Sequence, residues 1–239
     1  MQCAQLRCSV TAYDVAVVAA HKRTGSEHFK LIAVSSVGSV FEWFDFFLYG
    51  SLAVVISRNF FSNASESTAF VLALLAFAAG FAVRPFGAIV FGFLGDLWGR
   101  KNTFLITLGL MGGATFAVGL LPTYRQIGAA APWILALLRM LQGLSVGGVY
   151  GGAATYVAEH VVVRRRGFYT SWIQTTATVG MALSLVVVFI TRRIVGESAF
   201  GDWGWRIPFL LSSVLLGVTI WIQLSLSESP VYLEMKAVG

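Results

Sequence analysis

Six long apolar runs constrain most strongly what this chain can fold into. They cover about residues 31–57, 69–94, 103–121, 133–157, 168–191 and 206–226. Each run reaches the roughly 20 residues that a helix needs to cross the hydrocarbon core of a bilayer. The sequence therefore predicts an all-α membrane protein, built as a bundle of six transmembrane helices.

The composition agrees with a membrane protein and argues against a nucleic-acid partner. Hydrophobic residues make up 57% of the chain and charged residues only 12%, whereas a soluble domain carries roughly a quarter charged. The net charge is +6, but the bases lie beside apolar runs, where they set membrane orientation. The two cysteines, Cys3 and Cys8, match no metal-binding pattern. We expect no cofactor and no metal site.

The distribution of Lys and Arg predicts the orientation in the membrane. Six spans return the chain to the side on which it began. With the N-terminal tail in the cytoplasm, ten Lys and Arg residues flank the spans on the cytoplasmic side and five on the other side. Bases are enriched in cytoplasmic loops. We therefore expect both termini in the cytoplasm of a bacterial cell, with the protein in the inner membrane.

The two ends of the chain carry no span. Residues 1–30 place an apolar patch before a group of bases, which is the reverse of a secretory signal peptide. We expect them to form a disordered cytoplasmic tail, and residues 227–239 to form a truncated cytoplasmic end. Residues 31–226 form the transmembrane bundle.

A polar stretch from Gly92 to Lys101 separates the second and third runs. Three glycines allow backbones to approach closely and turn sharply. One acid and two bases accompany them near the membrane boundary. The sequence predicts a short loop between two membrane helices, formed by Gly92, Gly95, Asp96, Gly99, Arg100 and Lys101.

Two carboxyl groups lie within the first span. Gly38, Glu42, Asp45 and Tyr49 follow one another at steps of four, three and four residues, so they share one helical face. Carboxyl groups at membrane depth cost several kcal/mol unless they are paired, protonated or in a water-filled cavity. We expect Glu42 and Asp45 to face the interior of the bundle.

Arg84 in the second span is the predicted partner of Glu42. The two residues are equally far from Asn63, at the centre of the connection, and so lie at similar depth. One interpretation is that Glu42 or Asp45 takes up a proton near Arg84. The alternative is a fixed ion pair that only holds two helices together. Intramembrane ionisable residues favour the functional interpretation, and the sequence does not decide between the two carboxyls.

The fourth and fifth spans carry further polar candidates. Arg139 and Gln142 are one turn apart, which favours an inward Arg139 over one that extends to the membrane surface. Gly143 and Gly147 belong to a small-residue ridge suited to close helix packing. Gln174 opens a polar stretch that either lines a cavity or, in its Thr residues, bonds back to its own helix.

These residues together resemble a known family. The chain resembles the N-terminal half of a major facilitator superfamily transporter, specifically the bacterial metabolite:proton symporters, over about residues 31–236. The elements that carry the resemblance are Glu42-Trp-Phe-Asp45-Phe-Phe-Leu-Tyr49-Gly50, Arg84-Pro85, Gly92 to Lys101, Arg139-Met-Leu-Gln142-Gly143, Trp203-Gly-Trp205-Arg206-Ile-Pro208-Phe209 and Glu228-Ser-Pro230.

The resemblance implies roles for these residues. The loop from Gly92 to Lys101 becomes a gating motif whose charges stabilise one access state, and the chain has no Gly-Pro dipeptide of the kind found in antiporters. Three departures stand out, namely Leu97 in place of a base, Val149 in place of an acid, and six spans in place of twelve. We assign proton coupling to Glu42, Asp45, Arg84 and Arg139, and the substrate cavity to Tyr49, Gln142 and Gln174.

The predicted function is proton-coupled symport of a small organic acid or zwitterionic osmolyte by a half-length chain. Its expected partners are the solute, a proton, the lipid bilayer, and a missing C-terminal half or a second copy. The alternatives are an inactive fragment or a non-transporting receptor or regulator. An enzyme is disfavoured, because no metal-type cluster and no activated nucleophile occurs, and Ser35, Ser36 and Ser39 lack a base.

Overall fold

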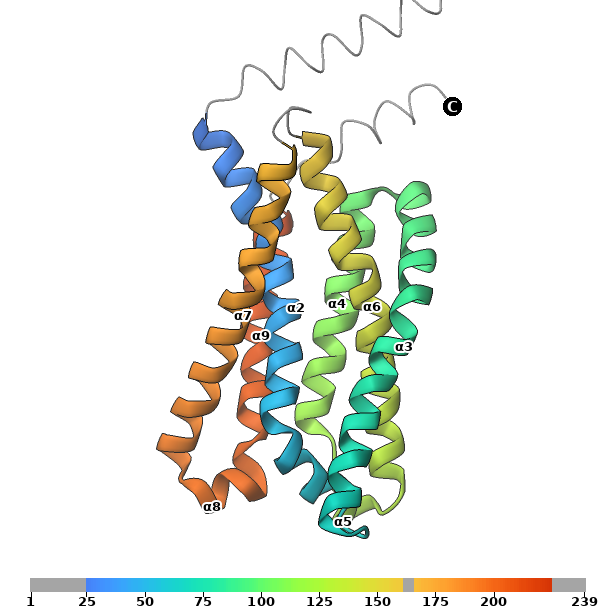
Figure 1. Cartoon of the computed structure of the whole chain (residues 1–239), viewed down its shortest axis with the longest axis vertical. Coiled ribbons are helices and arrows are strands. Elements are labelled where there is room, and N and C mark those ends of the chain that lie inside the picture. The colour runs from blue at the N-terminus through green and yellow to red at the C-terminus, as the bar shows by residue number, and fades with distance from the viewer. Residues whose placement is uncertain (1–24, 161–165, 225–239) are drawn as a thin grey trace, which may run out of the picture.

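The computed structural model describes residues 25–160 and 166–224, and in this part of the chain every regular element is helical (Figure 1). The six long helices are α2 (Gly25–Phe60), α3 (Glu66–Trp98), α4 (Arg100–Leu120), α6 (Ala130–His160), α7 (Arg166–Val195) and α9 (Arg206–Leu224). Short elements α5 (Tyr124–Ile127), α8 (Glu197–Ala199) and the π-helix η2 (Phe200–Gly204) lie in the connections.

The long helices have the length and composition of membrane spans. Five of them qualify alone, and the sixth does so when the segments Glu197–Gly204 and Arg206–Trp221, bent by 63°, are taken as one span. Each predicted apolar run coincides with one long helix, so the all-α, six-helix fold class is confirmed. Residues 25–30, expected in the tail, belong to α2 instead. The rest of the predicted 1–30 tail, residues 1–24, and the predicted 227–239 end lie outside the described residues.

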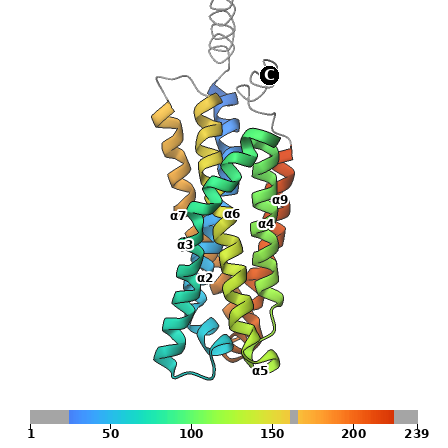
Figure 2. The ribbon, with the colours of Figure 1, turned by 90° about the vertical axis from the view of Figure 1, so that its right-hand side faces the viewer.

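The helices run up and down a single bundle. The start of α2, the α3–α4 turn and the end of α9 lie at one end, while α5 and α8 lie at the other (Figure 1). Helix α3 packs along α6, α2 along α7, and α4 between α6 and α9 (Figure 2). Helix α2 is the central one, because 56% of its apolar window is buried, against 22% in α3 and in α7.

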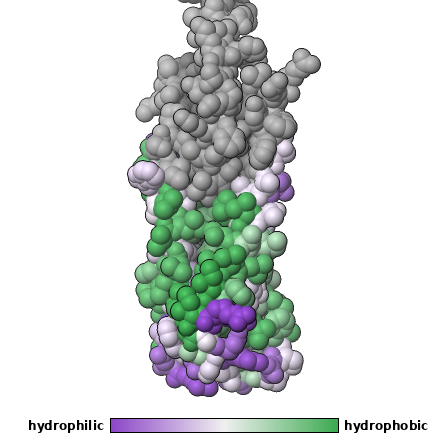
Figure 3. All heavy atoms as spheres, turned by 90° about the vertical axis from the view of Figure 1, so that its left-hand side faces the viewer, coloured by the Kyte–Doolittle hydropathy of each residue, from purple (hydrophilic) through white to green (hydrophobic). Residues whose placement is uncertain are grey.

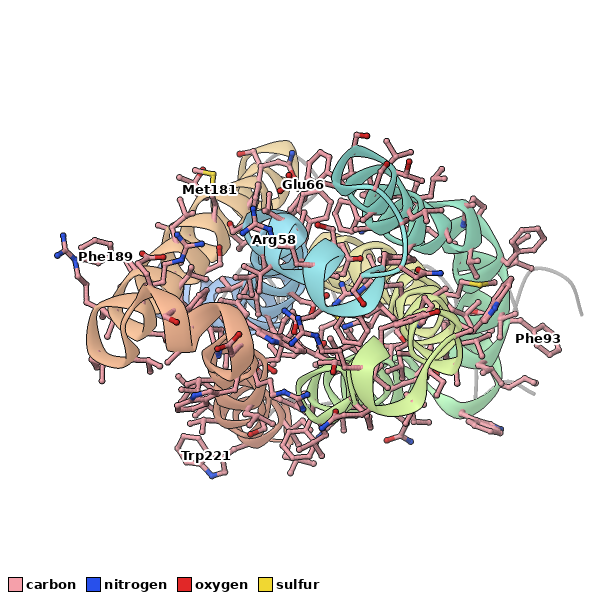
Figure 4. All side chains as sticks on the ribbon, turned by 90° about the horizontal axis from the view of Figure 1, so that it is seen from below. Arg58, Glu66, Phe93, Met181, Phe189 and Trp221 are labelled. Atoms are coloured by element: carbon pink, nitrogen blue, oxygen red, sulfur yellow. The ribbon has the colours of Figure 1, made fainter. Side chains whose placement is uncertain are left out.

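The outside of the bundle is apolar over most of its height. The face that includes α7 presents a hydrophobic band above a polar lower rim (Figure 3). Viewed along the bundle, Phe93, Phe189 and Trp221 point outward from α3, α7 and α9 (Figure 4), and each is more than half exposed. A lipid-facing surface requires this arrangement, since the bilayer solvates apolar side chains and leaves backbone groups to bond within helices.

Glycines bring α3 and α6 into backbone contact. A methyl group placed on Gly143 would overlap the carbonyl oxygen of Gly80, and one on Gly147 would overlap that of Arg84. Small residues drive helix association in membranes because they let backbones approach. The predicted packing role of Gly143 and Gly147 is therefore confirmed.

The turn between α3 and α4 is shorter than the sequence predicts. Helix α3 continues to Trp98, and Gly99 alone, with φ of +94°, turns the chain into α4. The expected loop is wrong at Gly92, Gly95 and Asp96, which lie in the last turns of α3. Each helical glycine costs only about 1 kcal/mol, which is less than the cost of unpaired backbone groups near the membrane. A methyl group on Gly92 or Gly95 would meet no described atom within 4 Å.

Candidate functional site

Asp45 is the centre of a buried hydrogen-bond network that joins three helices. It lies on α2 and is only 4% exposed. Its Oδ1 accepts from Thr115 Oγ1 of α4 at 2.9 Å and from Gln142 Nε2 of α6 at 3.0 Å. Its Oδ2 accepts from Arg139 Nη1 of α6 at 3.3 Å. Both carboxylate oxygens therefore have donors, as an ion buried in a low-dielectric interior requires.

Helix geometry explains how these side chains meet. Arg139 and Gln142 are one turn apart on α6, so both reach the same side of α2. Thr115 couples the two arms of the network, because its hydroxyl accepts from Gln142 Nε2 at 2.7 Å and lies 2.9 Å from Asp45. The Thr115 hydroxyl also lies 3.0 Å from the Met111 carbonyl of the same helix, which is an alternative acceptor for the hydroxyl proton. The network thus contains a donor that can change its partner.

Arg139 points into the bundle rather than toward the membrane surface. It is 3% exposed, and its guanidinium carbon lies 4.1 Å from the centre of the Tyr49 ring. Its Nε and Nη2 have no hydrogen-bond partner among the described residues. The Tyr49 hydroxyl is engaged elsewhere and donates to the Ala73 carbonyl at 3.0 Å. Only one of the Arg139 nitrogens thus carries the ion pair.

A cavity of about 30 Å³ lies beside the network, between α2, α3 and α6. Two acids, Glu42 and Asp45, and two bases, Arg84 and Arg139, line it. Its remaining lining is Phe46, Phe77, Gly80, Phe81, Gln142, Gly143 and Val146. The four intramembrane ionisable residues predicted from the sequence are therefore brought together around one space.

The predicted ion pair between Glu42 and Arg84 does not form in the described structure. The intramembrane pair joins Arg139 to Asp45 instead. Arg84 packs its guanidinium carbon 4.1 Å from the centre of the Phe81 ring, and this cation–π contact directs it along α3. Glu42 is 4% exposed, and its Oε2 has no hydrogen-bond partner in the described part of the chain. Glu42 and Arg84 line the same cavity, as their similar depth in the membrane predicted, but they do not form an ion pair.

The residues predicted for the substrate cavity are separated in the structure. Gln142 lines the cavity. Tyr49 lies buried under Arg139 and outside that lining. Gln174 is exposed on α7, away from the cavity. Thr115 was missed by the sequence analysis, because a Thr in an apolar helix usually bonds only its own backbone.

The predicted gating residues lie at the end of the bundle that holds the α3–α4 turn. Asp96 is exposed in the last turns of α3. Lys101 Nζ, at the start of α4, donates to the Leu224 carbonyl of α9 at 3.0 Å. Arg100 begins α4, and its side chain is outside the described set. The Lys101 hydrogen bond ties the α3–α4 turn to Leu224, the last described residue of α9.

No cluster of three metal-ligand side chains occurs within residues 25–160 and 166–224. The charged side chains that line the cavity are two carboxyl groups and two guanidinium groups. The Asp45 carboxylate is held by an arginine, an amide and a hydroxyl, and its hydrogen bond from the arginine is the charge-assisted one.

Comparisons with known proteins place the chain in a family. Residues 31–238 match the family described as sugar (and other) transporter. The chain is 42% identical over 203 residues to the proline/betaine transporter of Escherichia coli K12, covering 85% of this chain and 41% of that protein. It is 39% identical over 198 residues to the alpha-ketoglutarate permease of the same strain, covering 83% and 46%. The chain thus spans less than half the length of these relatives.

Solved structures show the same fold. The major facilitator superfamily proton:xylose symporter XylE, a protein of E. coli, superimposes with a TM-score of 0.79 at 19% identity, covering 90% of this chain and 48% of XylE. The six helices therefore match a major facilitator half in arrangement, and the 42% identity to a transporter extends the match to sequence. This multi-pass membrane protein belongs to the sugar (and other) transporter family of the major facilitator superfamily.

Proposed function

We propose that this chain forms the N-terminal half of a secondary active transporter that couples a proton to a small organic acid or zwitterionic osmolyte. The support comes from relatives named as carriers of proline and betaine, of alpha-ketoglutarate and of shikimate. Alternating access needs two bundles that rock about a central site. A second six-helix bundle, from a C-terminal half or a second copy, is therefore part of the proposal.

The buried pair of Asp45 and Arg139 carries the proposal. An ionised Asp45 holds Arg139 by charge and is held in turn by Gln142 and Thr115. A proton on Asp45 cancels that charge and weakens its hold on Arg139, since hydrogen bonds between ions are roughly twice as strong as neutral ones. Arg139 then becomes available to another anion. Because Arg139 lines the same cavity as Glu42 and Arg84, its release changes the charge that a solute meets there.

The α3–α4 turn supplies the proposed gate. Gly99 is the only residue between α3 and α4, so movement of one helix end is transmitted directly to the other. Lys101 fixes this end to α9 through the Leu224 carbonyl. In the proposed orientation this end faces the cytoplasm of a bacterial cell, the protein lies in the inner membrane, and Asp96, Arg100 and Lys101 exchange partners with the second bundle.

Uptake by a reconstituted pair of halves tests the function. The chain is co-expressed with the C-terminal half of the E. coli proline/betaine transporter, and uptake of labelled glycine betaine, proline and 2-oxoglutarate is measured in energised vesicles with and without a protonophore. We expect accumulation of one of these solutes that the protonophore abolishes. Absence of gradient-driven uptake with any second half would reject the symporter in favour of a receptor or an inactive fragment.

Asp45→Asn provides the specific control for coupling. We expect the variant to lose accumulation driven by the proton gradient but to retain exchange of labelled for unlabelled solute. The matched substitution Asp202→Asn, at an exposed position in η2, is expected to leave both activities unchanged. Proton-driven accumulation that persists in Asp45→Asn would assign coupling to another group.

A further inference from the structure

Two charged residues of the cavity lining, Glu42 and Arg84, form no ion pair with each other. Glu42 Oε2 is buried with no hydrogen-bond partner among the described residues, and the same is true of Arg84 Nε. Both residues line the cavity. A buried carboxylate oxygen without a donor costs more than one that is bonded. The site therefore lacks a donor beside Glu42 and an acceptor beside Arg84.

The other two charged groups cannot fill these positions. Both oxygens of Asp45 are taken by Thr115, Gln142 and Arg139. Arg139 lies on the Tyr49 ring and bonds Asp45. Arg139 Nε and Nη2 and Gln142 Oε1 also lack a hydrogen-bond partner among the described residues. Glu42 and Arg84 are nevertheless the acid and the base of the cavity lining that form no ion pair.

Three phenyl rings that pack on one another form an aromatic wall of the cavity, and Arg84 lies over two of them, Phe46 and Phe81. The centroids of Phe46, Phe77 and Phe81 lie 5.1 to 5.5 Å from one another. Aromatic faces attract cations, and alkylated ammonium groups are bound in this way. Phe81 is 39% exposed and Arg84 is only half buried, so these two are the more accessible residues of the cavity lining. The zwitterion proposed below is larger than the cavity of about 30 Å³, and its binding requires these two side chains to move.

We propose that this site binds a small zwitterion, whose ammonium group lies against Glu42 and the phenyl wall and whose carboxylate lies on Arg84. The assignment rests on the proposed function and narrows its solute class. A ligand that carries only carboxylates would place a negative group next to Glu42, which penalises it. The zwitterion satisfies both free groups at once.

The test uses three ligands that differ in one charge each. Glycine betaine carries a trimethylammonium and a carboxylate, 3,3-dimethylbutyrate replaces the ammonium nitrogen by carbon, and choline lacks the carboxylate. Their affinities are measured by calorimetry on the full chain in lipid nanodiscs, with no proton gradient. We expect glycine betaine to bind at least about tenfold more tightly than either analogue, the effect of one charge-assisted contact.

Glu42→Gln separates the role of the acid from general damage. The variant is expected to lose the preference for glycine betaine over 3,3-dimethylbutyrate while its affinity for 3,3-dimethylbutyrate is kept or increased, which also shows that it folds. Glu66→Gln, the same substitution at an exposed position on α3, keeps the preference. Arg84→Gln is expected to weaken both carboxylate ligands by the same factor.

Several results would overturn the assignment. Equal affinity of the wild type for glycine betaine and 3,3-dimethylbutyrate would show that the site recognises a carboxylate alone. An unchanged preference in Glu42→Gln would exclude Glu42, and no measurable binding of any of the three ligands would reject the site. Loss of proton dependence in Asp45→Asn is measured separately. The symporter proposal can therefore stand if the zwitterion site fails, and the zwitterion site can stand if the symporter proposal fails.

Discussion

Removal of Arg139 alone should destabilise the bundle strongly, because it strands a buried negative charge. In Arg139→Met the Oδ2 atom of Asp45 loses the guanidinium donor, while Thr115 and Gln142 still bond Oδ1. Breaking one side of a buried pair costs roughly 3–5 kcal/mol, and the remaining two donors place this case near the lower value. At about 2–4 °C per kcal/mol for a chain of this size, the midpoint of thermal unfolding should fall by roughly 10 °C.

The charge itself, rather than lost packing, should account for most of that fall. The double variant Asp45→Asn with Arg139→Met removes both ions. We expect its fall in midpoint temperature to be less than half of the fall in Arg139→Met. The surface pair of Arg58 and Glu66, 2.8 Å apart and well exposed, serves as the matched control (Figure 4). Because exposed pairs contribute about 0–1 kcal/mol, Arg58→Met should shift the midpoint by only about 1–2 °C.

Thermal unfolding of the purified chain, followed by tryptophan fluorescence in one detergent, measures all four proteins. A fall in Arg139→Met no larger than that in Arg58→Met would refute the reasoning. A double variant less stable than Arg139→Met would show that packing and not the stranded charge is responsible.

Two further predictions concern packing around the site. Gly143→Ala should lower the free energy of unfolding by about 1–3 kcal/mol through overpacking, because its methyl group would overlap the Gly80 carbonyl. The control is Gly113→Ala, whose added methyl group has no described atom within 4 Å. In the same thermal unfolding assay this control should be neutral or stabilising. Tyr49→Phe removes the donor to the Ala73 carbonyl and should cost about 1 kcal/mol without altering solute binding; loss of binding in this variant would instead place Tyr49 in the solute site.

Periodicity along single helices was predictable from the sequence. The steps between Glu42, Asp45 and Tyr49 placed all three on one face of α2, and all three are buried. The three-residue step from Arg139 to Gln142 brought both onto Asp45. These results follow from the 3.6-residue repeat, which depends on no neighbouring helix.

Contacts between helices were not predictable in the same way. Equal depth suggested that Glu42 pairs with Arg84, but depth says nothing of the rotation of α3 about its own axis, and the Phe81 ring holds Arg84 instead. Thr115 gave no signal, since its reach to Asp45 depends on how closely α4 approaches α2. The turn after α3 was misjudged because its glycines and charges match a loop, while the membrane boundary favours a continued helix.

We propose that Asp45, held by Arg139, is the carboxyl group that exchanges the proton. Infrared difference spectroscopy of the full chain in lipid, recorded between alkaline and acidic pH, detects the carbonyl band of a buried carboxyl as it takes up a proton. We expect the wild type to show a band that disappears in Asp45→Asn and persists in Glu42→Gln. A band that persists in Asp45→Asn and disappears in Glu42→Gln would contradict it and assign the proton to Glu42.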